Sequence, residues 1–267
     1  MLEAVMSMHA YMLGVFFVFG SLVGSFLNVC IYRVPLAVSI VAPRSRCNRC
    51  GVPIAWYDNL PIISFFILAG RCRFCGVYIG VRHFWIELFV GLASAFLFSQ
   101  YGVSFEFLYF FVFFSVLIVV TFIDIDHQII PDGISYWGMA TGVLLALHFE
   151  IAQMRWDVDF AQSILGLLFG GGLLWFVAWA YEKVTLREGL GFGDVKLMGF
   201  FGAHVGIEGV CFVLFYGAFL GSIVGVAMMI FGQAHKRTAI PFGPYLCLGL
   251  VLYELRIHEL FGFWSVV

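Results

Sequence analysis

Long uncharged stretches alternate with short polar segments along this chain of 267 residues. A helix that crosses a bilayer needs about 20 consecutive apolar residues. By that criterion the pattern predicts spans at residues 10–33, 82–101, 104–123, 130–149, 160–181, 191–206, 207–232 and 241–263. The sixth is short and interrupted by glycine, and no tandem repeat is evident. We therefore predict an all-α, polytopic membrane protein of about eight transmembrane helices.

The composition agrees with this pattern. Hydrophobic residues make up 63% of the chain and charged residues 11%, whereas soluble domains carry about 25% charged residues. The first residues hold Glu3 and no Lys or Arg, so we expect no secretory signal peptide. The expected partner is the lipid bilayer, not nucleic acid, and the composition leaves the oligomeric state open.

The distribution of Lys and Arg predicts the orientation. With the N-terminus outside, twelve Lys and Arg residues lie on inward loops and helix ends, against only Arg155 and Arg256 on the outward side. Cytoplasmic loops carry an excess of these residues. The residues that connect the third span to the fourth and the fifth to the sixth are therefore predicted to face the cytoplasm.

Two cysteine pairs of identical spacing lie in the only sizeable segment between predicted spans. Cys47-x-x-Cys50 and Cys72-x-x-Cys75 can supply four thiolates to one tetrahedral zinc ion, a closed and therefore structural site. Two redox or disulfide pairs are the alternative, which a cytoplasmic location disfavours. We predict a small zinc-ribbon-like module, and we assign the remaining cysteines to helix packing: Cys30, Cys211 and Cys247.

Several carboxylates lie at the ends of apolar helices, where burying an ionisable group in the membrane costs free energy. Asp124 follows the third span, and Asp194 follows the glycines Gly191 and Gly193. Two carboxylates brought within a few ångströms share a proton, so one can take a proton from water while the other polarises a scissile carbonyl. We predict that Asp124 and Asp194 meet as such a pair, on loops. A helix cap or a solvated charge is the alternative for any single Asp.

Other residues near this pair have less specific predicted roles. Asp132 follows Pro131 and is predicted to cap the next helix. Asp126 is predicted either to modulate the neighbouring residues or to contact solvent. On a helix, Lys196 would not share a face with Asp194, so Lys196 is predicted to mark the membrane boundary instead. The turn of Pro241, Gly243 and Pro244 before the last span is predicted to lie beside Asp194 and shape a substrate groove.

At these residues the sequence resembles the type IV prepilin peptidases, also called prepilin leader peptidases/N-methyltransferases, of the Gly-x-Gly-Asp aspartic protease class. The shared motifs cover nearly the whole chain. They are GSFLNV (24–29), YRVP (32–35), the four cysteines, NLPIIS (59–64), GRCRFC (70–75), Glu87, IDIDHQIIPD (123–132), GLGFGDVK (189–196) and IPFGPY (240–245).

The resemblance implies an enzyme of the bacterial inner membrane that removes the leader peptide of type IV prepilins or pseudopilins at the cytoplasmic face. It serves type IV pili or type II secretion. The family's catalytic aspartates map onto Asp124 and Asp194. The implied domains are a first transmembrane helix (1–34), a cytoplasmic four-cysteine zinc-binding module (35–81) and a transmembrane aspartic peptidase domain (82–267).

Many members of this family also N-methylate the new N-terminal residue with S-adenosyl-L-methionine. No Rossmann fingerprint is present, so a pocket for that cofactor is expected in the membrane or at the cysteine module. The candidate residues are Asn28, Arg33, Asn59 and Glu87, each of which has helix capping or interfacial anchoring as the alternative.

Two other functions fit parts of the pattern. Membrane carboxylates and glycine-broken helices are also found in cation transporters and channels, although those sites lie near the bilayer midplane and these aspartates lie at one face. A non-enzymatic zinc-ribbon adaptor is a further alternative, but it gives the two aspartates no role.

Overall fold

The computed structural model describes residues 2–153, 158–185, 189–231 and 240–255, with side chains from Met8 onward. The described part is helical and contains no strand, which confirms the predicted all-α class. The chain divides into two compact units, Met1–Val119 and Val120–Val267. The boundaries predicted at residues 34 and 81 remain a prediction.

Among the residues that the structure describes, six helices are long and apolar enough to cross a membrane. They are α1 (Leu2–Arg33, apolar from Met8), α3 (Arg82–Tyr101), α4 (Phe105–His127), α5 (Asp132–Ile151), α6 (Phe160–Thr185) and α7 (Phe192–Ile230). A further helix, α8 (Gly243–Glu254), begins where the last predicted span begins. The rest of that span, and five residues of the orientation argument, lie outside the described residues: Arg155, Arg187, Lys236, Arg237 and Arg256.

Helix α7 contains the break that separates two of the predicted spans. A straight helix of its 39 residues would be about 58 Å long, roughly twice the thickness of a bilayer core. At Gly206 the backbone adopts φ 66° and ψ −171°, a conformation that glycine tolerates because it lacks Cβ. The predicted division between residues 206 and 207 therefore coincides with a backbone break.

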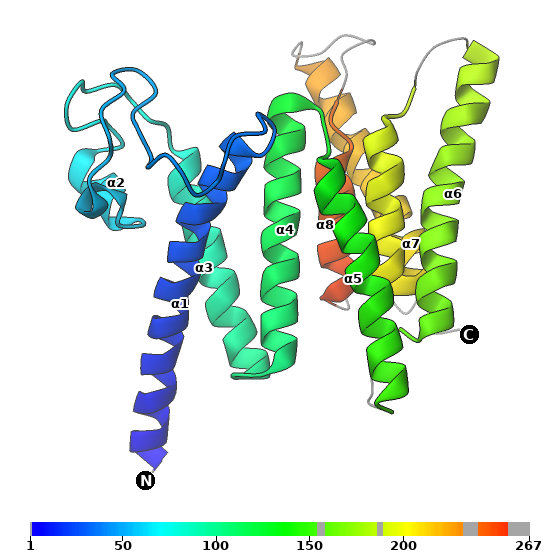
Figure 1. Cartoon of the computed structure of the whole chain (residues 1–267), viewed down its shortest axis with the longest axis horizontal. Coiled ribbons are helices and arrows are strands. Elements are labelled where there is room, and N and C mark those ends of the chain that lie inside the picture. The colour runs from blue at the N-terminus through cyan, green and yellow to red at the C-terminus, as the bar shows by residue number, and fades with distance from the viewer. Residues whose placement is uncertain (1, 154–157, 186–188, 232–239, 256–267) are drawn as a thin grey trace. The chain divides into compact units, whose positions relative to one another are not determined.

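Unit 1 is built on the antiparallel helices α1 and α3 (Figure 1). Their backbones approach closely at glycine: a Cβ on Gly24 would lie 2.8 Å from the Cα of Glu87, and Gly91 faces Ser21. Between these helices the chain forms a loop module with a 3-10 turn, η1 (Trp56–Asn59), and the short helix α2 (Ile63–Leu68).

Unit 2 packs α5, α6 and α8 around α7 (Figure 1). Gly138 faces Phe200 and Gly142 faces Ala203, so α5 runs parallel to the first half of α7. Gly217 faces Leu246 and Gly249 faces Val213, so α8 runs antiparallel to the second half. Gly166 and Gly170 of α6 face α7 in the same way, and Gly221 of α7 faces Tyr245 of α8. Since α5 and α7 run in the same direction, their first residues lie at the same end of unit 2.

Candidate active site and metal centre

Asp124 lies in the last turn of α4, and the predicted loop position is wrong. The helix continues beyond the apolar run because its backbone bonds continue: the N–H of Gln128 donates to the carbonyl oxygen of Asp124 at 2.9 Å. The helix ends at His127, where Gln128 takes a φ of 54°. The Asp124 side chain is buried, with the residue 5% exposed.

Asp194 is likewise helical, as the third residue of α7. Gly191 is the N-cap, and its carbonyl oxygen accepts a hydrogen bond from the N–H of Asp194 at 3.0 Å. A carboxylate in the first turn of a helix is favoured by the helix dipole. Asp194 is 9% exposed, so the second predicted catalytic residue is also buried.

The start of α8 contacts Asp124, and the carboxylates of the two aspartates interact with each other. The N–H of Gly243 donates to Oδ2 of Asp124 at 2.9 Å, and the carboxylate of Asp124 interacts electrostatically with that of Asp194. Both carboxylates also act on the buried thiol of Cys247, a residue that the sequence assigned only to packing. Two buried carboxylates from different helices thus interact with each other.

Glycine makes this close approach possible. A Cβ on Gly243 would lie 2.7 Å from Oδ2 of Asp124, closer than real Cβ contacts come. A Cβ on Gly193 would lie 3.1 Å from the Cβ of Ile130, so the loop after Asp124 packs onto the turn before Asp194. A Cβ on Gly191 would lie 3.4 Å from Oδ2 of Asp194.

An ion pair links the starts of α5 and α7. Lys196 Nζ binds Oδ1 of Asp132, and the ammonium group lies over the rings of Tyr136 and Phe192, at 5.8 and 5.3 Å from their centroids. The predicted capping role of Asp132 is wrong, because Pro131 occupies the N-cap position. Lys196 therefore joins two helices, beyond the boundary role that the sequence suggested.

The remaining predicted residues of this region have simpler positions. Asp126 is exposed at the end of α4, as expected for a residue that meets solvent. Pro244 lies in the first turn of α8, directly after Gly243, and Pro241 precedes the helix. The turn contacts Asp124 through Gly243, and its predicted position beside Asp194 itself remains a prediction.

The four paired cysteines of unit 1 converge, as predicted from their spacing. The Sγ atoms of Cys47, Cys50, Cys72 and Cys75 all lie within 4.8 Å of one another, and Cys47 and Cys75 are 3.7 Å apart. A tetrahedral zinc ion with Zn–S bonds of about 2.3 Å requires S···S distances of about 3.8 Å. The residues therefore fit a structural zinc ion.

A repeat explains why the cysteines converge, and the sequence analysis missed it. Residues 45–54 (SRCNRCGVPI) and 70–79 (GRCRFCGVYI) align without gaps. Each has a glycine of positive φ after its second cysteine, Gly51 at 71° and Gly76 at 65°. Corresponding backbone bonds follow in both copies: Cys47 N–H to Val52 at 3.0 Å and Cys72 N–H to Val77 at 2.9 Å. The two copies thus form two matching metal-binding knuckles.

The knuckle backbone favours thiolate at one cysteine. The backbone N–H groups of Cys50 and Arg49 lower the pKa of Cys47 to about 6. At Cys75 the N–H of Val77 also favours thiolate, yet burial and the neighbouring sulfurs raise the pKa to about 11. Several thiolates in this space repel one another, so a cation bound among them would stabilise the module.

Replacing Cys72 with serine is expected to remove the metal and loosen the whole module between residues 35 and 81. Too little apolar surface is buried in so small a module to hold it without metal. The measurement is zinc per chain by elemental analysis, with limited proteolysis of the same samples. Cys211→Ser, a single cysteine of unit 2, is the control and should change neither. Wild-type protein purified without chelator and free of metal would refute the zinc assignment.

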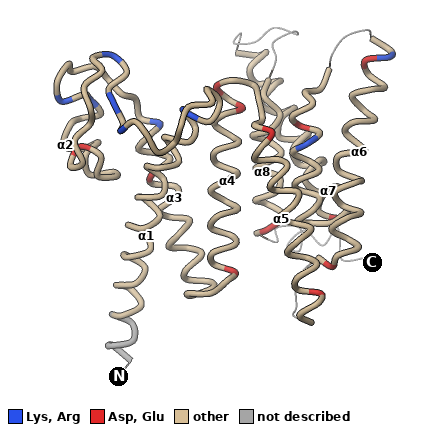
Figure 2. Tube along the Cα trace, viewed as in Figure 1, with Lys and Arg blue, Asp and Glu red and all other residues tan. Residues whose placement is uncertain are grey.

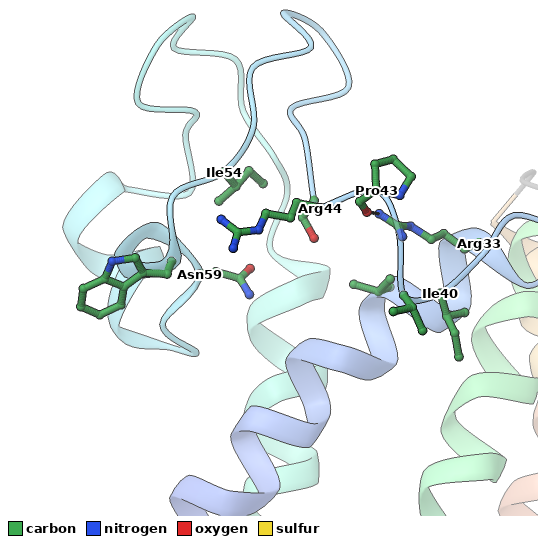
Figure 3. A pocket seen from close by; sticks show the side chains of 10 residues that line it. Arg33, Ile40, Pro43, Arg44, Ile54 and Asn59 are labelled. Carbon is green, nitrogen blue, oxygen red and sulfur yellow. Dashed lines mark hydrogen bonds between the residues drawn. The ribbon is translucent and has the colours of Figure 1, made fainter.

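All four candidate cofactor residues line one cavity of about 580 Å³ in unit 1. They are Asn28, Arg33, Asn59 and Glu87. A smaller cavity of about 320 Å³ shares Arg33, Arg44 and Asn59 with it, and Figure 3 shows these side chains around that smaller space. The larger cavity also contains arginines from both knuckles and the carboxylate of Asp58.

Three of the four candidates have structural partners. The Nδ2 group of Asn28 donates to the carbonyl oxygens of Gly24 at 3.2 Å and His83 at 3.4 Å. Arg33 donates to the carbonyl oxygens of Ser39 at 2.8 Å and Pro43 at 2.7 Å, which holds the loop after α1. Glu87 accepts a hydrogen bond from the N–H of Ile62 at 2.8 Å, which holds α2 to α3. In the same module Arg73 lowers the pKa of Asp58 through hydrogen bonds from Nε to Oδ2 at 2.8 Å and from Nη2 to Oδ1 at 2.5 Å.

Comparison with known proteins matches most of the chain. Residues 18–101 match the model of the bacterial peptidase A24 N-terminal domain, and residues 111–226 match that of the type IV leader peptidase family. No solved structure matches.

Several curated relatives carry the name prepilin leader peptidase/N-methyltransferase, among them three from different organisms. The protein of Myxococcus xanthus is 40% identical over 223 residues, which is 83% of this chain but 65% of the relative. That of Dichelobacter nodosus is 32% identical, over 94% of this chain and 96% of the relative. That of Pseudomonas putida is 33% identical, over 90% and 88%.

Proposed function

This chain belongs to the type IV leader peptidase family, and we propose that it cuts the leader peptide from prepilins or pseudopilins with Asp124 and Asp194 as its catalytic pair. The observation that supports the proposal is the electrostatic interaction of these two buried carboxylates at the ends of different helices, with Gly243 bound to one of them.

The contacts support a division of labour between the aspartates. The N–H of Gly243 stabilises negative charge on Asp124, so Asp124 is the group that takes a proton from the attacking water. Asp194 then carries the shared proton and polarises the scissile carbonyl. The roles exchange when the leaving amine is protonated, because the proton belongs to the pair.

The proposed location is the bacterial inner membrane, with the active site on its cytoplasmic side. The excess of Lys and Arg on the loops at this end of the predicted topology supports that orientation. A positively charged leader would then reach carboxylates at the same end, of which Asp126 is exposed.

Incubation with a purified prepilin tests this function against the transporter alternative. Enzyme reconstituted in phospholipid vesicles is expected to shorten the prepilin by its leader, and the same vesicles are expected to show no cation flux. Cation flux without a shortened product would favour the transporter. Neither the cleavage readout nor the flux readout depends on whether the cysteine module holds a zinc ion.

The second proposed activity is N-methylation of the new N-terminus with S-adenosyl-L-methionine, which supplies an electrophilic methyl group. The larger cavity of unit 1 fits this molecule by the residues that line it, since arginines suit the carboxylate of the methionine part and the carboxylate of Glu87 suits its cationic groups. Asn59, at the junction of both cavities, would hydrogen-bond a polar edge of the ligand.

Replacing Asn59 with alanine is expected to raise the KM for S-adenosyl-L-methionine about tenfold, the loss of one hydrogen bond to a charged or polar ligand. Cleavage should not change. Methylation of a pre-cut peptide, followed by mass spectrometry at several cofactor concentrations, gives the value. Gln100→Ala, which changes a carboxamide outside both cavities, is the control. An unchanged KM in Asn59→Ala would remove this residue from the cofactor site.

A further inference from the structure

Helix α2 presents an uncovered apolar face. Ile63, Phe66 and Ile67 are 56%, 68% and 68% exposed, and their spacing places them on one side of the helix. Trp56 of the adjoining turn η1 is 77% exposed. A cluster of large exposed apolar side chains marks a binding surface on a protein or a membrane. We call these four residues the α2 face.

Contacts with α3 fix the level at which the α2 face lies. Phe65 stacks on Phe84 with ring centroids 5.0 Å apart, and Phe66 meets the same ring at 5.5 Å. The N–H of Ile62 binds Glu87, which lies about 7 Å along α3 from its first residue. Since α3 is long and apolar enough to cross the membrane, α2 lies beside the first turns of a membrane-spanning helix (Figure 1).

The α2 face continues into the outer surface of α3. Phe84 contacts Trp85 at 5.3 Å, and Trp85 stacks on Phe89 at 5.7 Å. Trp85, Phe89 and Leu92 are all exposed and recur at the helical spacing of a single stripe. A stripe of this kind on a membrane-spanning helix faces lipid, so an unbroken series of aromatic contacts leads from lipid to α2.

Charge within the module lies outside helix α2, and the charged residue of the adjoining turn η1, Asp58, is paired with Arg73. Helix α2 contains no charged residue, whereas the knuckles carry Arg46, Arg49, Arg71 and Arg73. Figure 2 shows the Lys and Arg positions of this module on its loops, away from the α2 turn. Amphipathic segments that lie in a membrane interface combine such an apolar face with basic residues at the level of the headgroups.

We propose that α2 is an interfacial anchor, which inserts Trp56, Ile63, Phe66 and Ile67 into the bilayer and holds the cysteine module against the membrane surface. The occupant of the face is lipid. The anchor would hold the module's cavity at the level of the membrane surface. The N-terminus of a membrane-embedded protein emerges from the bilayer at this level. The proposal does not rest on the peptidase or methyltransferase activity.

Photo-crosslinking in lipid tests the anchor, with a matched control in the same module. Phe74, between the cysteines of the second knuckle, is 66% exposed, close to the value for Phe66. Each is replaced separately, in the full chain, by p-benzoylphenylalanine. The protein is reconstituted in vesicles of phosphatidylethanolamine and phosphatidylglycerol, irradiated, and examined by mass spectrometry for adducts.

Lipid adducts are expected at position 66 and not above background at position 74. Absence of lipid adducts at position 66, or equal yields at both positions, would overturn the anchor. Cross-links from position 66 to a second copy of the chain, or to a co-reconstituted prepilin, would assign the face to a protein instead. Elemental analysis and thermal melting of both variants show that each retains the fold, since one aromatic side chain replaces another.

Discussion

Replacing Asp124 or Asp194 with asparagine is expected to slow leader cleavage by about 10²–10⁴-fold, the range for losing acid–base assistance. An amide neither accepts nor gives the proton that the pair exchanges with water and the leaving amine. The double variant should be about as slow as either single variant, because residues that act as one unit do not contribute additively. The measurement is the initial rate of prepilin cleavage by purified, reconstituted enzyme.

Glu106 provides a control on the same helix as Asp124. It lies in the first turn of α4 and is exposed, so Glu106→Gln removes a carboxylate at the opposite end and should leave the rate unchanged. Both aspartate variants should insert into the membrane and accumulate like wild type. A rate near wild type from either Asp124→Asn or Asp194→Asn contradicts the catalytic pair.

Replacing Gly243 with alanine is expected to lower kcat by about 10²-fold, the effect of displacing a reacting group by roughly 1 Å. The added Cβ would lie 2.7 Å from Oδ2 and 3.2 Å from Cγ of Asp124. Either the carboxylate or the start of α8 must move, and the hydrogen bond from the Gly243 N–H is then lost or distorted. Cleavage kinetics at saturating substrate measure the effect on kcat separately from binding.

Gly133→Ala is the matched control for this prediction. Gly133 also lies in the first turn of a helix of unit 2, but a Cβ there meets no atom within 4 Å. Alanine should be tolerated, since it is a better helix former than glycine by up to about 1 kcal/mol. Wild-type kcat in Gly243→Ala would show that this close contact does not position Asp124.

The sequence predicted the membrane-spanning helices and the family because both depend on strong patterns. Long apolar runs specify helices in a bilayer, where every backbone group must be satisfied within the segment. The family prediction, with its activity class, is confirmed by the comparisons. The convergence of the four cysteines is confirmed as well, because paired spacing of thiolates is tied to the geometry of one metal ion.

Helix ends were less predictable than helix interiors. The sequence ended the third span at the last apolar residue, yet α4 continues through Asp124 to His127. Hydropathy reports where lipid surrounds a helix, whereas backbone hydrogen bonding decides where the helix stops. Asp132 was predicted to cap a helix, but it forms an ion pair with Lys196. Local sequence does not reveal this pair, because Lys196 lies 64 residues away along the chain.

The contact between Gly243 and Asp124 joins residues 119 positions apart, and no local pattern specifies it. The IPFGPY motif signalled a tight turn, but only the antiparallel packing of α8 on α7 shows which carboxylate the turn meets. The knuckle repeat, by contrast, was visible in the sequence at a fixed offset. A comparison of residues 45–54 with residues 70–79 would have found it.

The most direct test of the catalytic pair separates cleavage from methylation in one assay. Wild type, Asp124→Asn and Asp194→Asn are incubated with S-adenosyl-L-methionine and either an intact prepilin or the same protein with its leader already removed. Mass spectrometry reports both products. The account predicts that wild type cuts and methylates the intact prepilin, and that both variants leave it uncut yet still methylate the pre-cut protein. A leaderless product from the intact prepilin in either variant, at the wild-type rate, would contradict it.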